Sequence, residues 1–342
     1  MKLSVLDQSP VAHGHTKAEA LRETIALARA SEKSGYHRFW VAEHHDSPSF
    51  AGTTPALLAL AVLDATSNIT VGSGGVLLGL HQPSQVAEAF EILSALHPGR
   101  VNLGVGRAGS GGTGEFNEKL IDLHTRLGVL PGAPGRNDMD IWLLGAGSGS
   151  APLAALFGAG YAHAHFLNPG SGKTALNQYT AHFQPGARRE RPEALAAVRV
   201  IAAETDSRAQ RLADTVRLWR ARKDLGDDRP FPNYAKAAQS SWSQEEIQRR
   251  NANEDRLIVG AANDVAERLT RFAENLGVDE LMITTPLPRL KDRILSHALL
   301  ADAVATLTQE TVKTAPPRPR VSLAGHSTAE RTGNASVDRS HP

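Results

Sequence analysis

The chain has 342 residues, and its 37 Lys and Arg residues nearly balance its 36 Asp and Glu residues, so the formal net charge of +1 provides no field that would attract nucleic acid or an anionic membrane. The absence of cysteine excludes disulfides, thiolate metal sites, iron–sulfur clusters and cysteine nucleophiles. The N-terminal sequence MKLSVLDQSP lacks the basic stretch and long apolar core of an export signal, and no apolar run approaches a membrane span, so we expect a cytoplasmic protein.

Strand-like and helix-like segments alternate along the chain. After the second predicted strand, TTPALLALAVLDA combines a Thr cap with an early Pro, which is typical of a helix start. Apolar strands that alternate with amphipathic helices predict a parallel sheet covered by helices, and eight such units favour a single (β/α)8 TIM barrel over a doubly wound sheet. The eight predicted strands are 3–7, 38–43, 68–78, 100–106, 141–145, 162–167, 194–204 and 280–286.

Two segments interrupt this alternation. Residues 207–257, between the seventh and eighth predicted strands, mix Pro, Gly, charges and aromatic residues, so we expect a long irregular insertion there. After the last strand a helix is predicted over about residues 291–310. From Lys313 the chain has almost no large apolar residues and is predicted to be a disordered tail. We therefore expect one barrel domain, 1–312, followed by a tail, 313–342.

In such a barrel, functional side chains lie at the C-terminal ends of the strands. These ends are more polar and richer in Gly than the opposite ends, as an active rim would be. They comprise Asp7-Gln8, Glu43-His44-His45, Ser73-Gly74-Gly75, Gly106-Arg107, Gly145 to Ser150, His163 to His165 and Thr284-Thr285.

The segment WVAEHHD (40–46) closes the second predicted strand with four ionisable side chains. Strand alternation would send Glu43 and His45 to one side and His44 to the other, which argues against a compact metal site that uses all three. One histidine that faces the barrel mouth, supported by the other histidine and Glu43, fits a proton-transfer site better.

The segment HAH (163–165) places two imidazoles on one face of a strand, a spacing that suits zinc. Metal-dependent barrel hydrolases also need carboxylates at the rim, typically on the last strand, where LMITTP has none. We therefore favour hydrogen-bonded or solvent-facing histidines, and keep a metal-dependent TIM-barrel hydrolase as an alternative function.

Two segments are candidates for binding a phosphate. GVGRAG (104–109) matches the dinucleotide fingerprint, but it follows the fourth strand and leads into a loop, so we set the Rossmann interpretation aside. In LLGAGSGSAPLAALFGAG a strand ends in alternating Gly and Ser and a helix begins at once, so backbone N–H groups and the hydroxyls of Ser148 and Ser150 could bind an anion. A Ser-capped helix after a flexible turn explains the same residues equally well.

With these segments in view, the chain resembles the bacterial-luciferase-like flavin monooxygenases, a (β/α)8 family, from Leu3 to about Leu307. No single segment is specific to this family, but the order and spacing of the matching segments along one chain are. These segments are RFWVAEHHD, GSGGVLL, HQP, VAEAFEILSALHPGRVNLGVGRA, IWLLGAGSGS and LIVGAANDVAERL. The resemblance implies that reduced FMN, supplied by a separate NAD(P)H:flavin reductase, activates dioxygen as a flavin hydroperoxide, which oxygenates a small organic substrate. It also implies a homodimer formed through the early helices.

The resemblance assigns roles to several rim residues. His44 corresponds to the catalytic base and Glu43 to the neighbouring acid that shapes the flavin pocket, whereas His45 is matched without a specific role. Ser73, Gly74 and Gly75 correspond to a segment that often contains a non-proline cis peptide under the isoalloxazine ring. The implied flavin-phosphate site comprises Arg107 and the loop residues Gly145, Gly147, Ser148, Gly149 and Ser150.

The sequence departs from the family pattern in two places. Ala146 stands where luciferases carry an acidic residue, and the segment 108–140 is shorter than in many relatives. Further phosphate ligands are therefore open, with Arg126 and Arg136 as candidates.

The resemblance leaves the chemistry partly open. In the insertion, Trp219, Phe231, Tyr234 and Trp242 could cover an apolar substrate, or could simply pack within the insertion. The nearest branch of the family suggests an actinomycete enzyme that modifies an aromatic or polyketide secondary metabolite. A deazaflavin-dependent oxidoreductase of the same superfamily is an alternative.

Overall fold

A computed structural model describes residues 1–107, 112–130, 139–147, 149–186 and 188–314, with side chains as far as residue 309. Ser148, Arg136 and almost all of the predicted tail lie outside the described residues. Lys313 and Thr314, expected to belong to the tail, instead end the last helix, so this helix runs further than the sequence pattern predicted.

Eight parallel strands form a closed barrel, because β10 pairs with both β1 and β8. The predicted (β/α)8 TIM barrel is confirmed, with every predicted strand in place. The barrel strands are β1 (Lys2–Asp7), β2 (Arg38–Val41), β3 (Thr70–Ser73), β5 (Val101–Gly106), β6 (Asp140–Gly145), β7 (Gly160–Ala164), β8 (Ala194–Ala203) and β10 (Glu280–Thr284).

Two further strands were not predicted as separate elements. The segment predicted as one strand over 68–78 is divided into β3 and β4 (Val76–Leu77), which pairs with β5. The other, β9 (Leu257–Ala261), pairs in parallel with the C-terminal half of β8 and is not one of the eight barrel strands.

Helices surround the barrel, and none of those described is long and apolar enough to cross a membrane. Local sequence explains their ends: Thr16 and Glu19 form a capping box before α1, Pro occupies the first turns of α2 and α3, and Gly277 ends α10 with a left-handed φ of 73°. The outer helices are α1 (Lys17–Lys33), α2 (Pro55–Ala65), α3 (Pro83–Leu96), α4 (Thr113–Leu127), α5 (Ser150–Leu156), α6 (Gly172–His182), α10 (Ala262–Leu276) and α11 (Leu290–Thr314).

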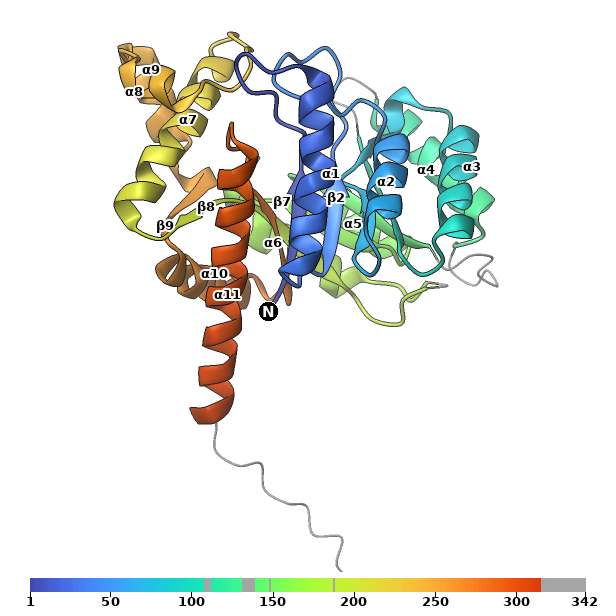
Figure 1. Cartoon of the computed structure of the whole chain (residues 1–342). Helices are drawn as coiled ribbons and strands as arrows, with labels where there is room; N and C mark the ends of the chain where they lie inside the picture. Colours follow the sequence, from blue (N-terminus) through green and yellow to red (C-terminus); the bar gives the residue numbers. More distant parts are fainter. Residues whose placement is uncertain (108–111, 131–138, 148, 187, 315–342) are drawn as a thin grey trace, which may run out of the picture.

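The expectation of an irregular insertion over 207–257 is wrong, because most of it is helical. It forms α7 (Asp206–Asp224), α8 (Tyr234–Gln239) and α9 (Gln244–Ala252), which lie on the side of the barrel away from the N-terminus (Figure 1). Thr205 caps α7 and Ser243 caps α9 through their side chains. The apolar positions of α7 are interspersed with Arg and Asp, which concealed their helical spacing.

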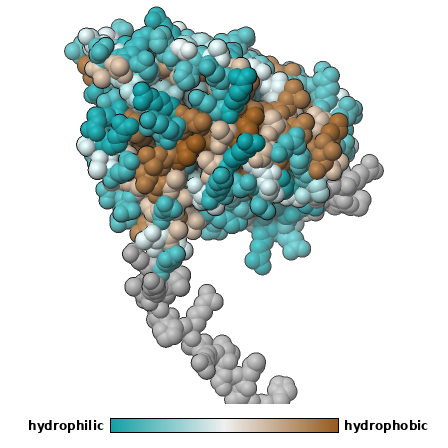
Figure 2. Space-filling view, viewed as in Figure 1, coloured by the Kyte–Doolittle hydropathy of each residue, from teal (hydrophilic) through white to brown (hydrophobic). Residues whose placement is uncertain are grey.

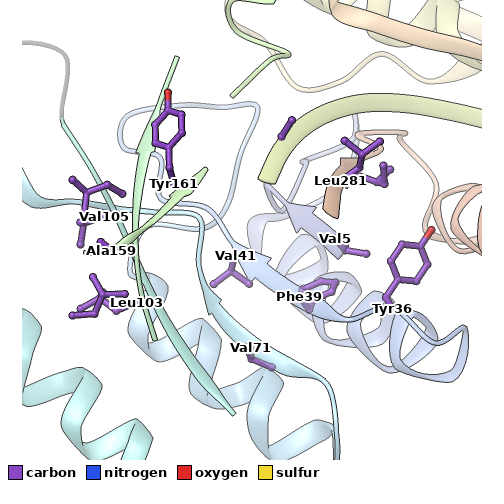
Figure 3. Close-up of a cluster of buried hydrophobic side chains, with 14 of the residues drawn as sticks. Val5, Tyr36, Phe39, Val41, Val71, Leu103, Val105, Ala159, Tyr161 and Leu281 are labelled. Carbon is purple, nitrogen blue, oxygen red and sulfur yellow. The ribbon is translucent and has the colours of Figure 1, made fainter. Parts of the chain in front are cut away.

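Strand alternation separates two apolar layers. Val5, Phe39 and Val41 point outward and pack with Val71 and Leu103 in the layer between the sheet and the helices (Figure 3). The intervening residues fill the interior of the barrel, which contains Leu6, Trp40, Ala42, Trp142, Ala162, Leu195, Ala197 and Met282. The interior is therefore packed, as expected for this fold.

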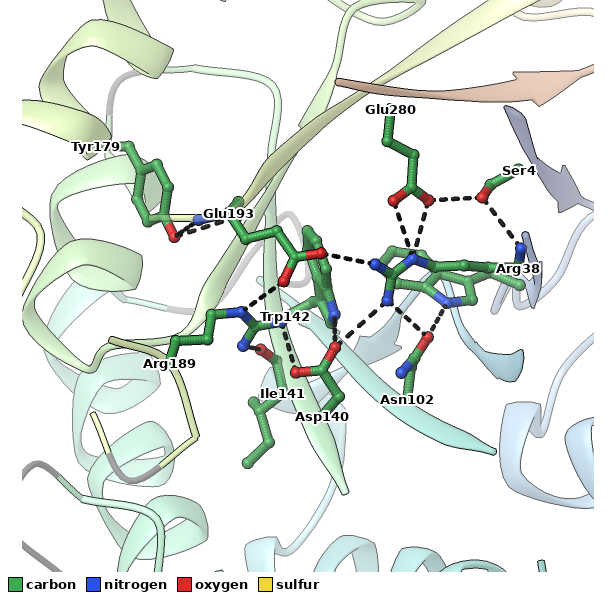
Figure 4. Close-up of polar contacts among 11 residues, drawn as sticks. Ser4, Arg38, Asn102, Asp140, Ile141, Trp142, Tyr179, Arg189, Glu193 and Glu280 are labelled. Atoms are coloured by element: carbon green, nitrogen blue, oxygen red, sulfur yellow. Dashed lines mark hydrogen bonds and ion pairs between the residues drawn. The ribbon is translucent and has the colours of Figure 1, made fainter. Parts of the chain in front are cut away.

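A charged network closes the N-terminal end of the barrel (Figure 4). The guanidinium of Arg38 donates to Glu280 from Nε at 2.9 Å and to Glu193 from Nη2 at 2.9 Å, and it also pairs with Asp140 at 3.3 Å. The same guanidinium lies over the ring of Trp142, 4.6 Å from its centroid. These residues lie at the strand starts, so they stabilise the end of the barrel opposite the rim.

Apolar patches interrupt the hydrophilic surface in Figure 2. The exposed large apolar side chains of the early helices are Leu57 on α2 and Ile92 and Leu96 on α3. Exposed apolar side chains on neighbouring helices can contribute to an interaction site.

Candidate functional site

A cavity of about 310 Å³ opens at the C-terminal ends of the strands, a volume within the range of small-molecule sites. Apolar side chains from the barrel interior, including Leu6, Trp40 and Met282, form its base. Its lining includes six of the predicted site residues: Glu43, His44, Gly74, Gly75, Arg107 and Gly145. A larger, open hollow of about 940 Å³ at the other end of the barrel contains none of them.

His44 faces the cavity just after β2. Its backbone N–H donates to the carbonyl of Gly52 at 2.8 Å, and its ring stacks on Phe50 with centroids 4.2 Å apart. Its Nε2 lies 3.5 Å from Nε2 of Gln8, and its buried Nδ1 has no hydrogen-bond partner among the described residues. Burial, aided by the charge of Lys223, lowers the pKa of His44 to about 4. The ring is therefore neutral at pH 7, and the same burial makes it a weaker base than a free imidazole.

Glu43 contacts His45 and His81, whereas His44 contacts Gln8 and Phe50; β2 ends at Val41, before these residues. The Glu43 side chain is fully buried, and its Oε1 accepts hydrogen bonds from Nε2 of His45 at 2.6 Å and of His81 at 2.7 Å. Its Oε2 accepts from the backbone N–H of Leu77 at 2.9 Å. His81 was missed, although it belongs to the HQP segment of the resemblance, because no local pattern indicated its contact with Glu43.

The Gly74–Gly75 peptide is cis, and neither residue is followed or preceded by proline. A Cβ on Gly74 would lie 2.6 Å from Cδ1 of Leu6, and one on Gly75 would lie 2.8 Å from the carbonyl oxygen of Gly104. Backbone blocks a side chain at Gly75, whereas at Gly74 the Leu6 side chain would have to move. The two glycines leave bare backbone along this part of the cavity wall.

Ser73 does not line the cavity. Its fully buried hydroxyl donates to the carbonyl of Gly104 at 2.8 Å and accepts from the N–H of the same residue at 3.0 Å. The expectation that Ser73 contacts a cofactor directly is therefore not supported by its position. It holds the glycine turn against β5 instead.

Arg107 and Gly145 bring the ends of β5 and β6 to the same cavity. Arg107 is exposed, and its Nη1 donates to the hydroxyl of Thr113 at 3.0 Å. In the loop that follows, carbonyls rather than N–H groups are engaged: Ser171 donates to Ala146 at 2.9 Å and Tyr161 to Gly147 at 3.4 Å.

The other candidate phosphate ligands divide into three groups. Gly147 and Gly149 lie between β6 and α5, Ser150 begins α5, and none of the three is part of the cavity lining. Ser148 and Arg136 lie outside the described residues. Arg126 pairs with Asp122 at 2.9 Å on the exposed face of α4 and does not line the cavity.

The histidines of HAH pack against aromatic rings. Nδ1 of His163 lies 3.4 Å from the hydroxyl of Tyr161, and the ring of His165 meets the ring of Phe272 edge-on at 4.6 Å. Burial lowers the pKa of His163 to about 4. In the part of the chain that the structure describes, neither histidine belongs to a cluster of three groups close enough to share a metal ion.

The aromatic residues of the insertion pack together instead of lining the cavity. Trp219 and Phe231 stack with centroids 4.3 Å apart, and both meet Phe50, the ring on which His44 stacks. Tyr234 donates to Asp292 at 2.8 Å, and Trp242 lies against Arg250. The packing interpretation therefore applies, and the insertion reaches the site through Phe50.

Comparisons with known proteins show which family the chain resembles. Residues 1–130 match the family model described as luciferase-like monooxygenase. The chain is 36% identical to the uncharacterized protein YwcH of Bacillus subtilis, over 89% of this chain and 99% of that protein. It is 34% identical to the N-acetyl-S-alkylcysteine monooxygenase of the same organism, over 89% of this chain and 98% of the relative. The crystal structure of apo-MsnO8 superposes with a TM-score of 0.80 at 37% identity, over 89% and 98% of the two chains.

Proposed function

Because the chain belongs to the luciferase-like monooxygenase family, we propose that it is a reduced-FMN-dependent monooxygenase that oxygenates a small organic substrate at the barrel rim. The observation that carries the proposal is one cavity that combines a neutral histidine, His44, with the bare Gly74–Gly75 backbone and the cation of Arg107. Reduced FMN, delivered by a separate NAD(P)H:flavin reductase, would supply the electrons that activate dioxygen.

The cavity fits a flat, partly apolar cofactor with an anionic end. Leu6, Trp40 and Leu144 provide apolar surface, and the side-chain-free Gly74–Gly75 peptide leaves room for a ring to approach the backbone. At the rim, the only described polar contact of Arg107 is the uncharged hydroxyl of Thr113, so its guanidinium is available to a phosphate. The isoalloxazine would lie inside and the phosphate near Arg107.

His44 and its neighbours would manage protons in this site. As a neutral imidazole, His44 would accept a proton from the substrate or cofactor, and Gln8, 3.5 Å away, would help to orient its ring. Glu43 would have a positioning role, because its two carboxylate oxygens hold the segment after β2 by hydrogen bonds from Leu77, His45 and His81. His45, predicted as a catalytic residue, would support Glu43 from the solvent side.

Equilibrium binding tests the cofactor. The purified protein should bind reduced FMN under anaerobic conditions, and mixing with oxygen should convert substrate to an oxygenated product. His44→Ala should retain reduced-FMN binding but lose product formation. Tight deazaflavin binding without FMN binding would replace this proposal with the hydride-transfer alternative, and unchanged turnover by His44→Ala would refute the role of the histidine.

The relative that oxidises an N-acetyl-S-alkylcysteine adds a thioether to the candidate substrates, beside the aromatic or polyketide metabolite expected from the sequence. Turnover assays with members of both classes separate them. A dimer through α2 and α3 is supported by the exposed Leu57, Ile92 and Leu96, and sedimentation equilibrium tests it. The cytoplasmic location stays a prediction from the sequence.

A further inference from the structure

We propose that Glu43, His45 and His81 form a binding site for one divalent transition-metal ion, such as Zn²⁺, beside the cofactor cavity. The three side chains converge, and their candidate ligand atoms all lie within 4.8 Å of one another. They come from two separate segments, the end of β2 and the turn before α3, which the fold brings together.

Their chemistry matches this class of ion. Two imidazole nitrogens and one carboxylate oxygen are ligands that Zn²⁺ and neighbouring transition metals accept, whereas Mg²⁺ and Ca²⁺ prefer oxygen. Three protein ligands leave a fourth position, which water would occupy. The cluster differs from the arrangement considered in the sequence, because His81 takes the place of His44.

Small movements would convert the hydrogen-bonded cluster into a metal site. Ligand atoms of a tetrahedral zinc site lie about 3.3 Å apart, given metal–ligand distances of about 2.0–2.2 Å. The two histidine–carboxylate distances of 2.6 and 2.7 Å would therefore lengthen slightly. The side chains of His45 and His81 are 39% and 31% exposed, so their rings have space to turn.

The carboxylate is better fixed than the histidines. Glu43 is fully buried, and its Oε2 is held by the N–H of Leu77 at 2.9 Å, so Oε1 would remain in place while the imidazoles exchange their hydrogen bonds for metal bonds. The protein thus contributes one immobile ligand and two adjustable ones. The outward-facing rings give the ion a route from solvent that does not pass through the cavity.

Zinc and cobalt titrations of the full chain, freed of metal with a chelator and free of FMN, test the site. Calorimetry with Zn²⁺ should give one ion per chain, and Co²⁺ should produce visible d–d absorption of a nitrogen–oxygen site. His81→Ala and, separately, His45→Ala should weaken Zn²⁺ binding about tenfold or more. The matched control is His97→Ala, which removes a histidine that pairs with a single carboxylate, Asp64, at 3.1 Å.

Thermal unfolding provides a second measurement. Zn²⁺ should raise the melting temperature of the wild type and of His97→Ala, and should have less effect on the two ligand variants. No saturable Zn²⁺ binding by the wild type, or equal binding by both ligand variants and the control, would overturn the proposal. Neither result depends on flavin chemistry, so failure here leaves the monooxygenase proposal untouched.

Discussion

The ring of His44 stacks on the ring of Phe50, 4.2 Å between centroids, and this contact helps to exclude water from the imidazole. Burial is the largest cause of its low pKa, about 4, against an ordinary value of 6.5. NMR titration should therefore find His44 neutral down to about pH 5. Phe50→Ala should move the pKa upward toward 6.5, and an unchanged value would show that Phe50 does not control the hydration of the ring.

The same shift makes stability depend on pH. Between pH 6.5 and about 4 the unfolded chain binds the His44 proton and the folded protein does not, so the free energy of unfolding falls as the pH is lowered through this window. His44→Asn should remove the contribution of His44 to this pH dependence. The free energy of unfolding of the variant, measured with denaturant at pH 7, 6 and 5, should therefore fall less steeply than that of the wild type. An identical slope in wild type and variant would contradict the prediction.

Gly75→Ala should destabilise the fold, because its Cβ would meet the backbone oxygen of Gly104 at 2.8 Å, where nothing flexible can move aside. We expect a loss of about 1–3 kcal/mol and weaker FMN binding. Gly114→Ala on α4 is the control, since its Cβ would have no neighbour within 4 Å. Denaturant unfolding and FMN titration of both variants check the prediction, and equal stabilities would refute it.

Arg107→Ala should weaken FMN binding about tenfold to a hundredfold and leave riboflavin binding nearly unchanged, because only FMN carries the phosphate. Arg107 is exposed, so stability should hardly change. Arg126→Ala, which removes an exposed arginine paired with Asp122, is the matched control and should bind both flavins normally. Equal losses for FMN and riboflavin would show that Arg107 does not bind the phosphate.

Glu280→Ala should cost about 1–3 kcal/mol of stability, because it leaves Nε of the buried Arg38 guanidinium without its carboxylate partner, although Glu193 and Asp140 still pair with the same guanidinium. Glu267→Ala, in an exposed pair with Arg271 on α10, should cost less than about 1 kcal/mol. Since the network lies at the barrel end opposite the rim, FMN affinity of folded Glu280→Ala should stay normal. A large change in affinity would indicate that the two ends are coupled.

The barrel could be predicted because its evidence is local: each strand is a short apolar run, and polar residues mark where it ends. The rim residues His44, Arg107 and Gly145 follow from the same pattern, since parallel strands bring their C-terminal ends together. The helix α7 was missed because its charged residues obscure the apolar spacing.

Contacts between distant segments could not be predicted in this way. His81 meets Glu43 only after the chain has turned at Gly74–Gly75, and the packing of Phe50 against Trp219 joins residues far apart in sequence. The buried hydroxyl of Ser73 likewise depends on the neighbouring strand.

The aromatic cluster of Phe50, Trp219 and Phe231 ties the loop that carries His44 to the helical insertion. Hydrogen bonds also connect the loop to the insertion: Trp219 donates to the hydroxyl of Ser49 at 2.8 Å, and Ser49 donates in turn to Asp228. Any displacement of α7 would therefore shift the imidazole mechanically. Movement of the insertion away from the barrel would therefore also displace His44 from the cavity. The site would be active only while the insertion is packed against the loop that carries His44.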